Sequence, residues 1–284
     1  MANPLLSLAA AAARWLPAPL RRILYRLGPV SSGLRSALNR AAPKGLAEVE
    51  VAGGTLAGTR LILEMHKEKD YWLGTYEIDL QQAVNDFVKP GMVAYDVGAN
   101  IGYVSLLLAK RAGMNGKVVA FEPLPENQDR FQKQLRLNRE ARIQLIPKAV
   151  GETSGKKEFL VHSSGGMGKI RGATGRDIQY KDTIEVECIT LDDFVFKQRN
   201  PKPNIVKIDI EGGEGLALQG ADKLISETKP LFIIELHGKE AAVECWQILT
   251  RASYTVHKLT RNYPEVASVT ELVWKSYILA RPKE

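Results

Sequence analysis

Acidic residues at the ends of apolar runs are the strongest chemical signal in this sequence. Asp96 lies near the end of one such run and is followed by Gly98 and Gly102. Because glycine has no Cβ, such a turn allows a ligand to approach the backbone closely. Asp96 would repel a pyrophosphate but attract a cationic amino-acid group, and the glycine spacing differs from the dinucleotide fingerprint. The turn therefore favours a nucleotide-type ligand with a positive charge, although an ordinary strand-to-helix turn has a similar composition.

A second carboxylate ends the next apolar run, in Phe121-Glu122-Pro123. In nucleotide-binding sheets, an acid at the end of the second strand binds the ribose hydroxyls. An acid at this position also stabilises the start of a helix through the helix dipole. We predict that Glu122 binds a ribose, with helix stabilisation as the alternative interpretation.

Two further blocks place carboxylates near a histidine. Asp209, Glu211 and Glu214 surround a glycine turn, and Glu235 and His237 follow another apolar run. Strand alternation points Glu235 and His237 to the same side. An imidazole titrates near neutral pH and neighbouring carboxylates raise its basicity, so His237 is the first candidate for a general base and Glu211 the second. A strand-end histidine that only hydrogen-bonds to a loop is an equally good interpretation.

The elements that position these residues alternate between strands and helices. This alternation indicates βαβ units, a mainly parallel sheet and right-handed crossovers. We predict core strands over 92–100, 117–123, 142–150, 204–211 and 230–238, helices over 101–113, 125–140, 214–225 and 241–252, and two final strands over 254–260 and 276–282.

Two regions interrupt this alternation. Residues 48–90 form a lead-in, for which we predict a β-hairpin followed by a helix over 77–88. Residues 155–190 form an insertion of two strands separated by the glycine-rich stretch 163–177. That stretch is too polar and too rich in glycine to pack as an element, so we predict a mobile loop near the active site.

Composition excludes several classes of protein. The chain has 284 residues, of which 45% are hydrophobic and 25% charged, so it can bury a large core and is neither collagen-like nor generally disordered. No apolar run approaches the ~20 residues that a spanning helix needs. Its two cysteines, Cys188 and Cys245, make no disulfide framework, and no Cys/His spacing indicates a zinc site. We therefore expect a protein of the cytoplasm.

The positive charge is concentrated at the N-terminus. Of the 39 basic residues, seven lie in residues 1–47, which contain no acid, so residues 48–284 hold 32 basic and 32 acidic residues. Residues 14–27 of this arm place leucine and isoleucine at helical spacing among arginines, a pattern that suits peripheral contact with an anionic membrane. A helix packed on the body, or a tail, is the favoured alternative. Residues 5–13 are apolar, but no basic segment precedes them, so we do not predict a signal peptide.

The blocks described above, in this order, resemble the FkbM family of S-adenosylmethionine-dependent methyltransferases. The matching motifs are YDVGANIGY, FEPLPEN, LRLN, AVGE, ITLDDF, VKIDIEGGE and IIELHG, with GTYE at residues 74–77. The resemblance covers about residues 70–240 and implies a Rossmann-like, class I methyltransferase α/β fold. Such a fold has a mostly parallel seven-stranded sheet with an antiparallel last strand and helices on both faces. We accordingly divide the chain into an arm, 1–47, and a methyltransferase domain, 48–284.

The resemblance also implies roles for individual residues. Asp209, Glu211, Glu235 and His237 would surround the transferred methyl group as catalytic residues. Glu122 would hold the ribose of S-adenosylmethionine, and the 98–102 turn would border its methionine part. The full set of expected cofactor-binding residues is Glu77, Asp96, Gly98, Asn100, Gly102, Tyr103, Glu122, Pro123, Ala149 and Asp209.

The expected reaction is O-methylation of a hydroxyl group on a small molecule or sugar. One alternative is a membrane-associated lipid or glycan acceptor, with the arm as a surface anchor, and another is an inactive cofactor-binding protein. The neutral body and the absence of an [DN]-P-P-[YF] block argue against a nucleic-acid substrate. The acidic cluster could bind Mg²⁺, but no typical metal motif can be placed, so we expect no metal. The sequence does not indicate the oligomeric state.

Overall fold

The computed structural model describes residues 4–15, 40–163, 166–175, 180–273 and 275–283. The chain forms two compact units. The first unit comprises Met1–Phe87 and Gln132–Glu140, and the second comprises Val88–Phe131 and Ala141–Glu284. All four predicted catalytic residues belong to the second unit.

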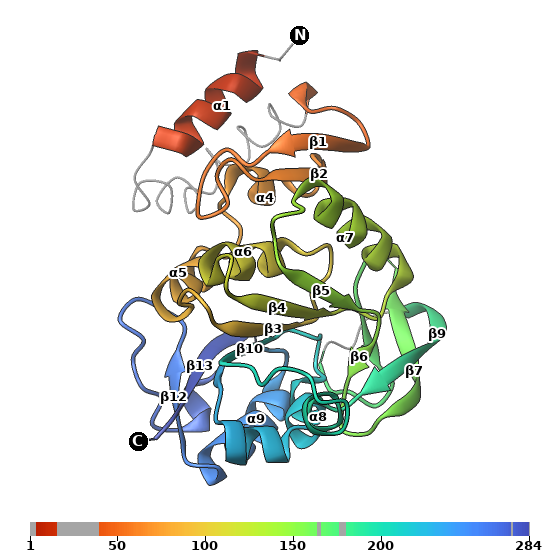
Figure 1. Cartoon of the computed structure of the whole chain (residues 1–284), viewed down its shortest axis with the longest axis vertical. Helices are drawn as coiled ribbons and strands as arrows, with labels where there is room; N and C mark the ends of the chain where they lie inside the picture. The colour runs from red at the N-terminus through yellow and green to blue at the C-terminus, as the bar shows by residue number, and fades with distance from the viewer. Residues whose placement is uncertain (1–3, 16–39, 164–165, 176–179, 274, 284) are drawn as a thin grey trace. The chain divides into compact units, whose positions relative to one another are not determined.

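A seven-stranded sheet forms the centre of the second unit (Figure 1). Its strand order is β12-β13-β11-β10-β3-β4-β5, and all neighbours are parallel except β13, which is antiparallel to both β11 and β12. This confirms the predicted mostly parallel sheet with an antiparallel last strand. The strands are β3 (Val93–Val97), β4 (Lys117–Phe121), β5 (Ile143–Ile146), β10 (Ile205–Ile208), β11 (Leu231–Leu236), β12 (Tyr254–Lys258) and β13 (Ser276–Pro282).

Helices cover both faces of this sheet, as predicted. Helix α6 (Tyr103–Ala112) lies on one face, and α8 (Glu214–Gln219) and α9 (Lys239–Arg251) lie on the other (Figure 1). Central strands are buried on both sides, which explains why β10 is buried at every position. Short helical turns complete the unit: η1 (Asp193–Lys197), η2 (Leu224–Thr228) and η3 (Val269–Glu271).

The predicted helix over 214–225 is broken into α8 and η2. Gly220 follows the last residue of α8, and a Cβ there would lie 2.2 Å from the carbonyl oxygen of Gly151. This close backbone approach requires glycine at the residue that follows α8.

The insertion strands β7, β8 and β9 form a four-stranded sheet together with β6, in the order β6-β9-β7-β8. The predicted strand 142–150 is divided, because β5 joins the central sheet and β6 (Ala149–Val150) joins this one. The prediction of a loop throughout 163–177 is wrong for β8 (Gly168–Ile170), which pairs with β7 (Gly155–His162). Ile170 packs into an apolar cluster with Phe159 of β7 and Val186 of β9 (Tyr180–Ile189), and this burial stabilises the short strand despite its glycine-rich surroundings.

The first unit contains the predicted hairpin, in which β1 (Leu46–Glu50) and β2 (Arg60–Glu64) pair antiparallel. Its helices are α1 (Pro4–Trp15), α4 (Lys69–Leu73) and α5 (Ile78–Phe87). Helix α7 (Pro125–Leu137) runs from the second unit into the first, where the Gln134 side chain bonds both the N–H and the carbonyl of Ile62. The predicted membrane-contacting segment 14–27 lies outside the described residues from residue 16 onward. Within the described part of the chain, no helix has the length and apolarity needed to cross a membrane.

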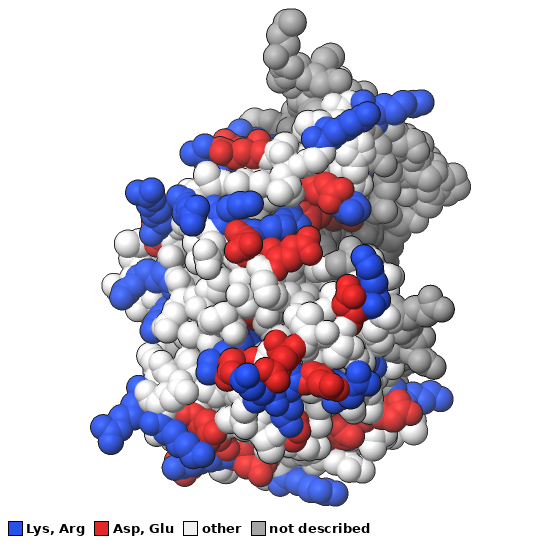
Figure 2. Space-filling view, turned by 90° about the vertical axis from the view of Figure 1, so that its right-hand side faces the viewer, with Lys and Arg blue, Asp and Glu red and all other residues white. Residues whose placement is uncertain are grey.

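Charges of both signs are interspersed on the face shown in Figure 2.

Candidate active site

In the turn between β3 and α6, contacts within the chain require glycine at two positions. Gly98 and Gly102 have φ values of 80° and 90°. A Cβ on Gly98 would lie 1.9 Å from the carbonyl oxygen of Asp209, and one on Gly102 would lie 2.2 Å from the ring of Phe131. The sequence suggested that these glycines make room for a ligand, whereas the structure gives each of them an intramolecular reason as well.

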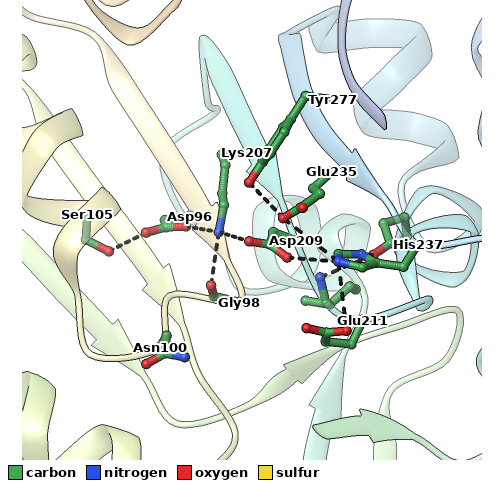
Figure 3. Close-up of polar contacts among 12 residues, drawn as sticks. Asp96, Gly98, Asn100, Ser105, Lys207, Asp209, Glu211, Glu235, His237 and Tyr277 are labelled. Carbon is green, nitrogen blue, oxygen red and sulfur yellow. Dashed lines mark hydrogen bonds and ion pairs between the residues drawn. The ribbon is translucent and has the colours of Figure 1, made fainter. Parts of the chain in front are cut away.

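Asp96 is fully buried beside this turn and is held by two side chains. Ser105 donates a hydrogen bond of 2.6 Å to one carboxylate oxygen, and the Lys207 ammonium lies 3.1 Å from the other. Lys207 also donates a 3.0 Å hydrogen bond to the carbonyl of Gly98 (Figure 3). Asp96 therefore anchors the turn through a buried ion pair. Lys207 was not predicted as a site residue, although a lysine inside the apolar run 204–208 is a signal that could have indicated one.

Glu122 is buried below the same turn, where donors converge on both of its oxygens. The backbone N–H groups of Asn100 and Leu124 donate at 2.8 and 2.9 Å, and the Asn127 amide donates at 3.2 Å. Burial raises the pKa of the Glu122 carboxyl above its usual value, and these hydrogen bonds act against the shift. The side chains of Asn100 and Asn127 also both donate to the carbonyl of Gly166 in the insertion. Asn127 was not predicted from the sequence.

His237 lies at the centre of the second group of predicted residues (Figure 3). Its Nε2 atom is 3.9 Å from an oxygen of Asp209, 3.8 Å from one of Glu211 and 3.9 Å from one of Glu235. Its Nδ1 atom is 2.9 Å from Glu214, which also accepts hydrogen bonds from the backbone N–H groups of residues 210 and 212. The structure thus brings all four predicted catalytic residues together.

The electrostatics of His237 reflect opposing effects. Burial by itself lowers the pKa of the imidazole, because a charged ring loses hydration. The hydrogen bond with Glu214 and the negative charges of Glu214, Asp209 and Glu235 act in the opposite direction and prevail. The resulting pKa of His237 is about 9.

Two further contacts to this group come from Tyr277 of β13 and from Lys275, which directly precedes that strand. The hydroxyl of Tyr277 donates a 2.7 Å hydrogen bond to Glu235, and the Lys275 ammonium lies 3.0 Å from the other oxygen of the same carboxylate. Neither residue was predicted, because no local pattern marks them and only the antiparallel pairing of β13 with β11 places them there.

The other predicted cofactor contacts are distributed more widely. Tyr103 begins α6, Pro123 follows β4 and Ala149 lies in β6, all in the second unit. Glu77 belongs to the first unit and directly precedes α5. Their contacts with a cofactor stay predictions.

Comparison with known proteins identifies the class of protein to which this fold and site belong. Residues 96–256, more than half of the chain, match the methyltransferase FkbM domain. The chain therefore belongs to the FkbM methyltransferase family and is an S-adenosylmethionine-dependent methyltransferase.

A curated relative and two solved structures are similar to parts of the chain. The hexuronic acid methyltransferase AglP of Haloferax volcanii is 27% identical over 172 residues, which cover 60% of this chain and 67% of the relative. A crystal structure of methyltransferase FkbM from Methylobacillus flagellatus aligns with a TM-score of 0.46 and 19% identity, covering 76% of this chain and 53% of that one. This chain thus spans about half the length of that protein. Precorrin-6y C5,15-methyltransferase from Geobacter metallireducens aligns with a TM-score of 0.43 and 16% identity, covering 73% and 88% of the two chains.

Proposed function

We propose that this methyltransferase transfers a methyl group to a hydroxyl oxygen of a sugar or a similar small molecule. The observation that carries the proposal is the cluster of Asp209, Glu211, Glu235 and His237 next to the glycine turn. Lys207 connects the two, since its ammonium contacts the carbonyl of Gly98 and lies 3.6 Å from Asp209. The similarity to a hexuronic acid methyltransferase supports a sugar acceptor.

The residues of the β3–β4 end suit the expected cofactor. When bound, S-adenosylmethionine supplies an activated methyl group on a sulfonium. We propose that Glu122 holds the ribose hydroxyls, because a carboxylate has several lone pairs and can accept further hydrogen bonds beyond those from the protein. The 98–102 turn would border the methionine part, with Asp96 neutralised behind it.

The chemical demand on the protein is to position a hydroxyl and to remove its proton. The exposed fractions of the side chains indicate which of them can reach the acceptor. Asp209 and Glu211 are 21% and 22% exposed, whereas His237 and Glu235 are nearly inaccessible. We therefore propose that Glu211 accepts the proton of the acceptor hydroxyl, and that the buried His237 and Glu235 hold the exposed carboxylates in place.

Calorimetry with S-adenosylhomocysteine tests the cofactor half of the proposal. We expect saturable binding by the full chain and at least tenfold weaker binding by Glu122→Gln, since the substitution removes a charged hydrogen-bond acceptor. Glu158→Gln is a matched control, because this exposed glutamate on β7 pairs with Arg171 of the insertion. Absence of binding, or equal binding by all three proteins, would refute the assignment of Glu122.

The acceptor is tested with free hexuronic acids and neutral hexoses. Release of S-adenosylhomocysteine identifies turnover, and alkaline treatment of the product distinguishes a methyl ether, which is stable, from a methyl ester, which is hydrolysed. We expect an alkali-stable ether. An ester as the only product would show that the acceptor is a carboxylate and would refute O-methylation of a hydroxyl.

A further inference from the structure

We propose that Asp209, Glu235 and His237 form a binding site for one divalent cation of the Mn²⁺ or Mg²⁺ type. Each residue offers one ligand atom, and the three atoms lie within 4.8 Å of one another. Binding of the cation does not depend on the acceptor, but its catalytic role rests on the proposed function. The sequence alone led us to expect no metal here.

The burial of the cluster distinguishes it from acidic groups on a protein surface. Glu235 and His237 are 2% and 1% exposed, and Asp209 opens toward solvent. Burying carboxylates and an imidazole in one place is unfavourable unless other groups or an ion compensate for their lost hydration, and Tyr277, Lys275 and Lys207 compensate for part of it at Glu235 and Asp209. The exposed edge at Asp209 gives an ion a path of entry.

The orientation of the imidazole is the second observation that points to a ligand. Nδ1 is engaged by Glu214, so Nε2 faces the carboxylates. Among the described residues, Nε2 meets only carboxylate oxygens, at 3.8–3.9 Å, which is too far for a hydrogen bond. An ion between Nε2 and a carboxylate oxygen would form one bond of about 2.1–2.3 Å to each atom, and the two bonds together span a gap of this length.

Outer contacts fix each of the three ligands. Glu214 orients His237, and Tyr277 donates to Glu235 at 2.7 Å. Lys207 lies 3.6 Å from one oxygen of Asp209 and leaves the other oxygen facing Nε2. A carboxylate on the other ring nitrogen, as Glu214 is on Nδ1, is typical of metal-binding imidazoles. Two carboxylate oxygens and one nitrogen suit Mn²⁺ or Mg²⁺ better than soft thiophilic ions.

The proposed cation would lower the pKa of an acceptor hydroxyl that binds to it. Glu211 is not among the three ligands, yet its carboxylate lies 3.8 Å from Nε2. It is therefore placed to take the proton that the hydroxyl releases, which agrees with its proposed role as the base.

Titration of the metal-stripped full chain with Mn²⁺ tests the site. We expect one Mn²⁺ per chain, and a ¹⁴N coupling in pulsed electron paramagnetic resonance that reports direct coordination by an imidazole. His237→Gln should abolish the ¹⁴N coupling, and Asp209→Asn should weaken Mn²⁺ binding at least tenfold. Glu185→Gln is the matched control, because this exposed carboxylate on β9 pairs with Lys156 and should change neither result.

Several outcomes would overturn the site. These are no Mn²⁺ binding, binding without ¹⁴N coupling, or unchanged binding by Asp209→Asn. Circular dichroism of each variant shows whether it is folded, and Asp209→Asn provides the test if His237→Gln is not. If S-adenosylhomocysteine binds and Mn²⁺ does not, only the cation site fails. If Mn²⁺ binds as expected but no sugar hydroxyl is methylated, only the proposed function fails.

Discussion

The carboxylates that follow β3 and β4 and those that follow β10 and β11 form two neighbouring groups with different surroundings. Asp96 and Glu122 receive short hydrogen bonds from Ser105 and from backbone N–H groups, and Asp96 also pairs with Lys207. The carboxylates around His237 instead face its Nε2 atom at 3.8–3.9 Å. Each oxygen of Asp96 and Glu122 has a donor within 3.2 Å. Glu235 is held in the same way by Tyr277 and Lys275, whereas Asp209 and Glu211 are partly exposed beside Nε2. Acidic residues with the same place in the sequence pattern, at the ends of parallel strands, therefore have different surroundings.

The largest expected effect distinguishes the two groups of carboxylates by their functions in catalysis and in cofactor binding. Glu211→Gln removes the proposed base, so kcat should fall by about 10²–10⁴-fold. The affinity for S-adenosylhomocysteine should stay within twofold of the parent chain, because Glu211 belongs to the β10–β11 group. Steady-state kinetics and calorimetry on the same preparation measure both quantities. A loss of cofactor affinity as large as the loss in kcat would contradict the division.

Lys207→Met tests the buried ion pair between Lys207 and Asp96, which connects the two groups of carboxylates. The Asp96 carboxylate would be left buried without its cation, and breaking such a pair costs about 3–5 kcal/mol. We expect a loss of this size in the free energy of unfolding, measured with urea. Adding Asp96→Asn should recover part of the loss, because it removes the unpaired charge. If the loss of unfolding free energy in the double variant equals the sum of the losses in Lys207→Met and Asp96→Asn, the two side chains do not interact.

The glycine turn is tested by a pair of alanine substitutions. Gly102→Ala and Gly91→Ala both place a Cβ on a residue with φ near 90°, and each should cost about 1–2 kcal/mol of folding free energy for the backbone conformation. Only Gly102→Ala also forces a Cβ against the ring of Phe131, which adds about 1–3 kcal/mol, whereas Gly91 has open space. Equal losses of unfolding free energy would mean that the turn can shift away from Phe131.

The smallest expected effect concerns the two cysteines, Cys188 in β9 and Cys245 in α9. Burial raises the pKa of Cys188 to about 11, and it raises the pKa of Cys245 well above its usual value, with further contributions from the charges of Glu214 and Glu244. Neither thiol should react with a disulfide reagent at pH 8 in the folded protein, and both should react in urea. As the pH rises toward 11, Cys188 should react first.

The raised pKa values of the two thiols also predict how the free energy of unfolding changes with pH. Both thiols have a higher pKa in the folded chain than in the unfolded chain, so the unfolded chain releases its protons first. The stabilisation that the neutral thiols provide is complete below pH 9 and is lost as the pH rises through about 11 for Cys188. Replacing Cys188 by alanine should reduce the decrease in stability between pH 9 and 11. If this decrease in stability is unchanged, groups other than Cys188 cause it.

The sequence predicted the site better than the contacts that hold it. Asp96, Glu122, Asp209 and Glu235 could be located because the carboxyl ends of parallel strands meet at one edge of a sheet. Lys207 could have been found as a charged residue in an apolar run. Tyr277 could not, since its position depends on the pairing of β13 with β11 across a long sequence separation. Strand β8 was missed because local composition predicted a loop, whereas burial of Ile170 determined the structure.

The position of Lys207 has a thermodynamic consequence. Its ammonium contacts Asp96, Asp209 and the carbonyl of Gly98, so one cation interacts with both groups of carboxylates. Any ligand that changes the charge around Asp209 also changes how strongly Lys207 holds the glycine turn. Linkage between two binding events is reciprocal, so the factor by which one ligand alters the affinity for the other is the same in both directions.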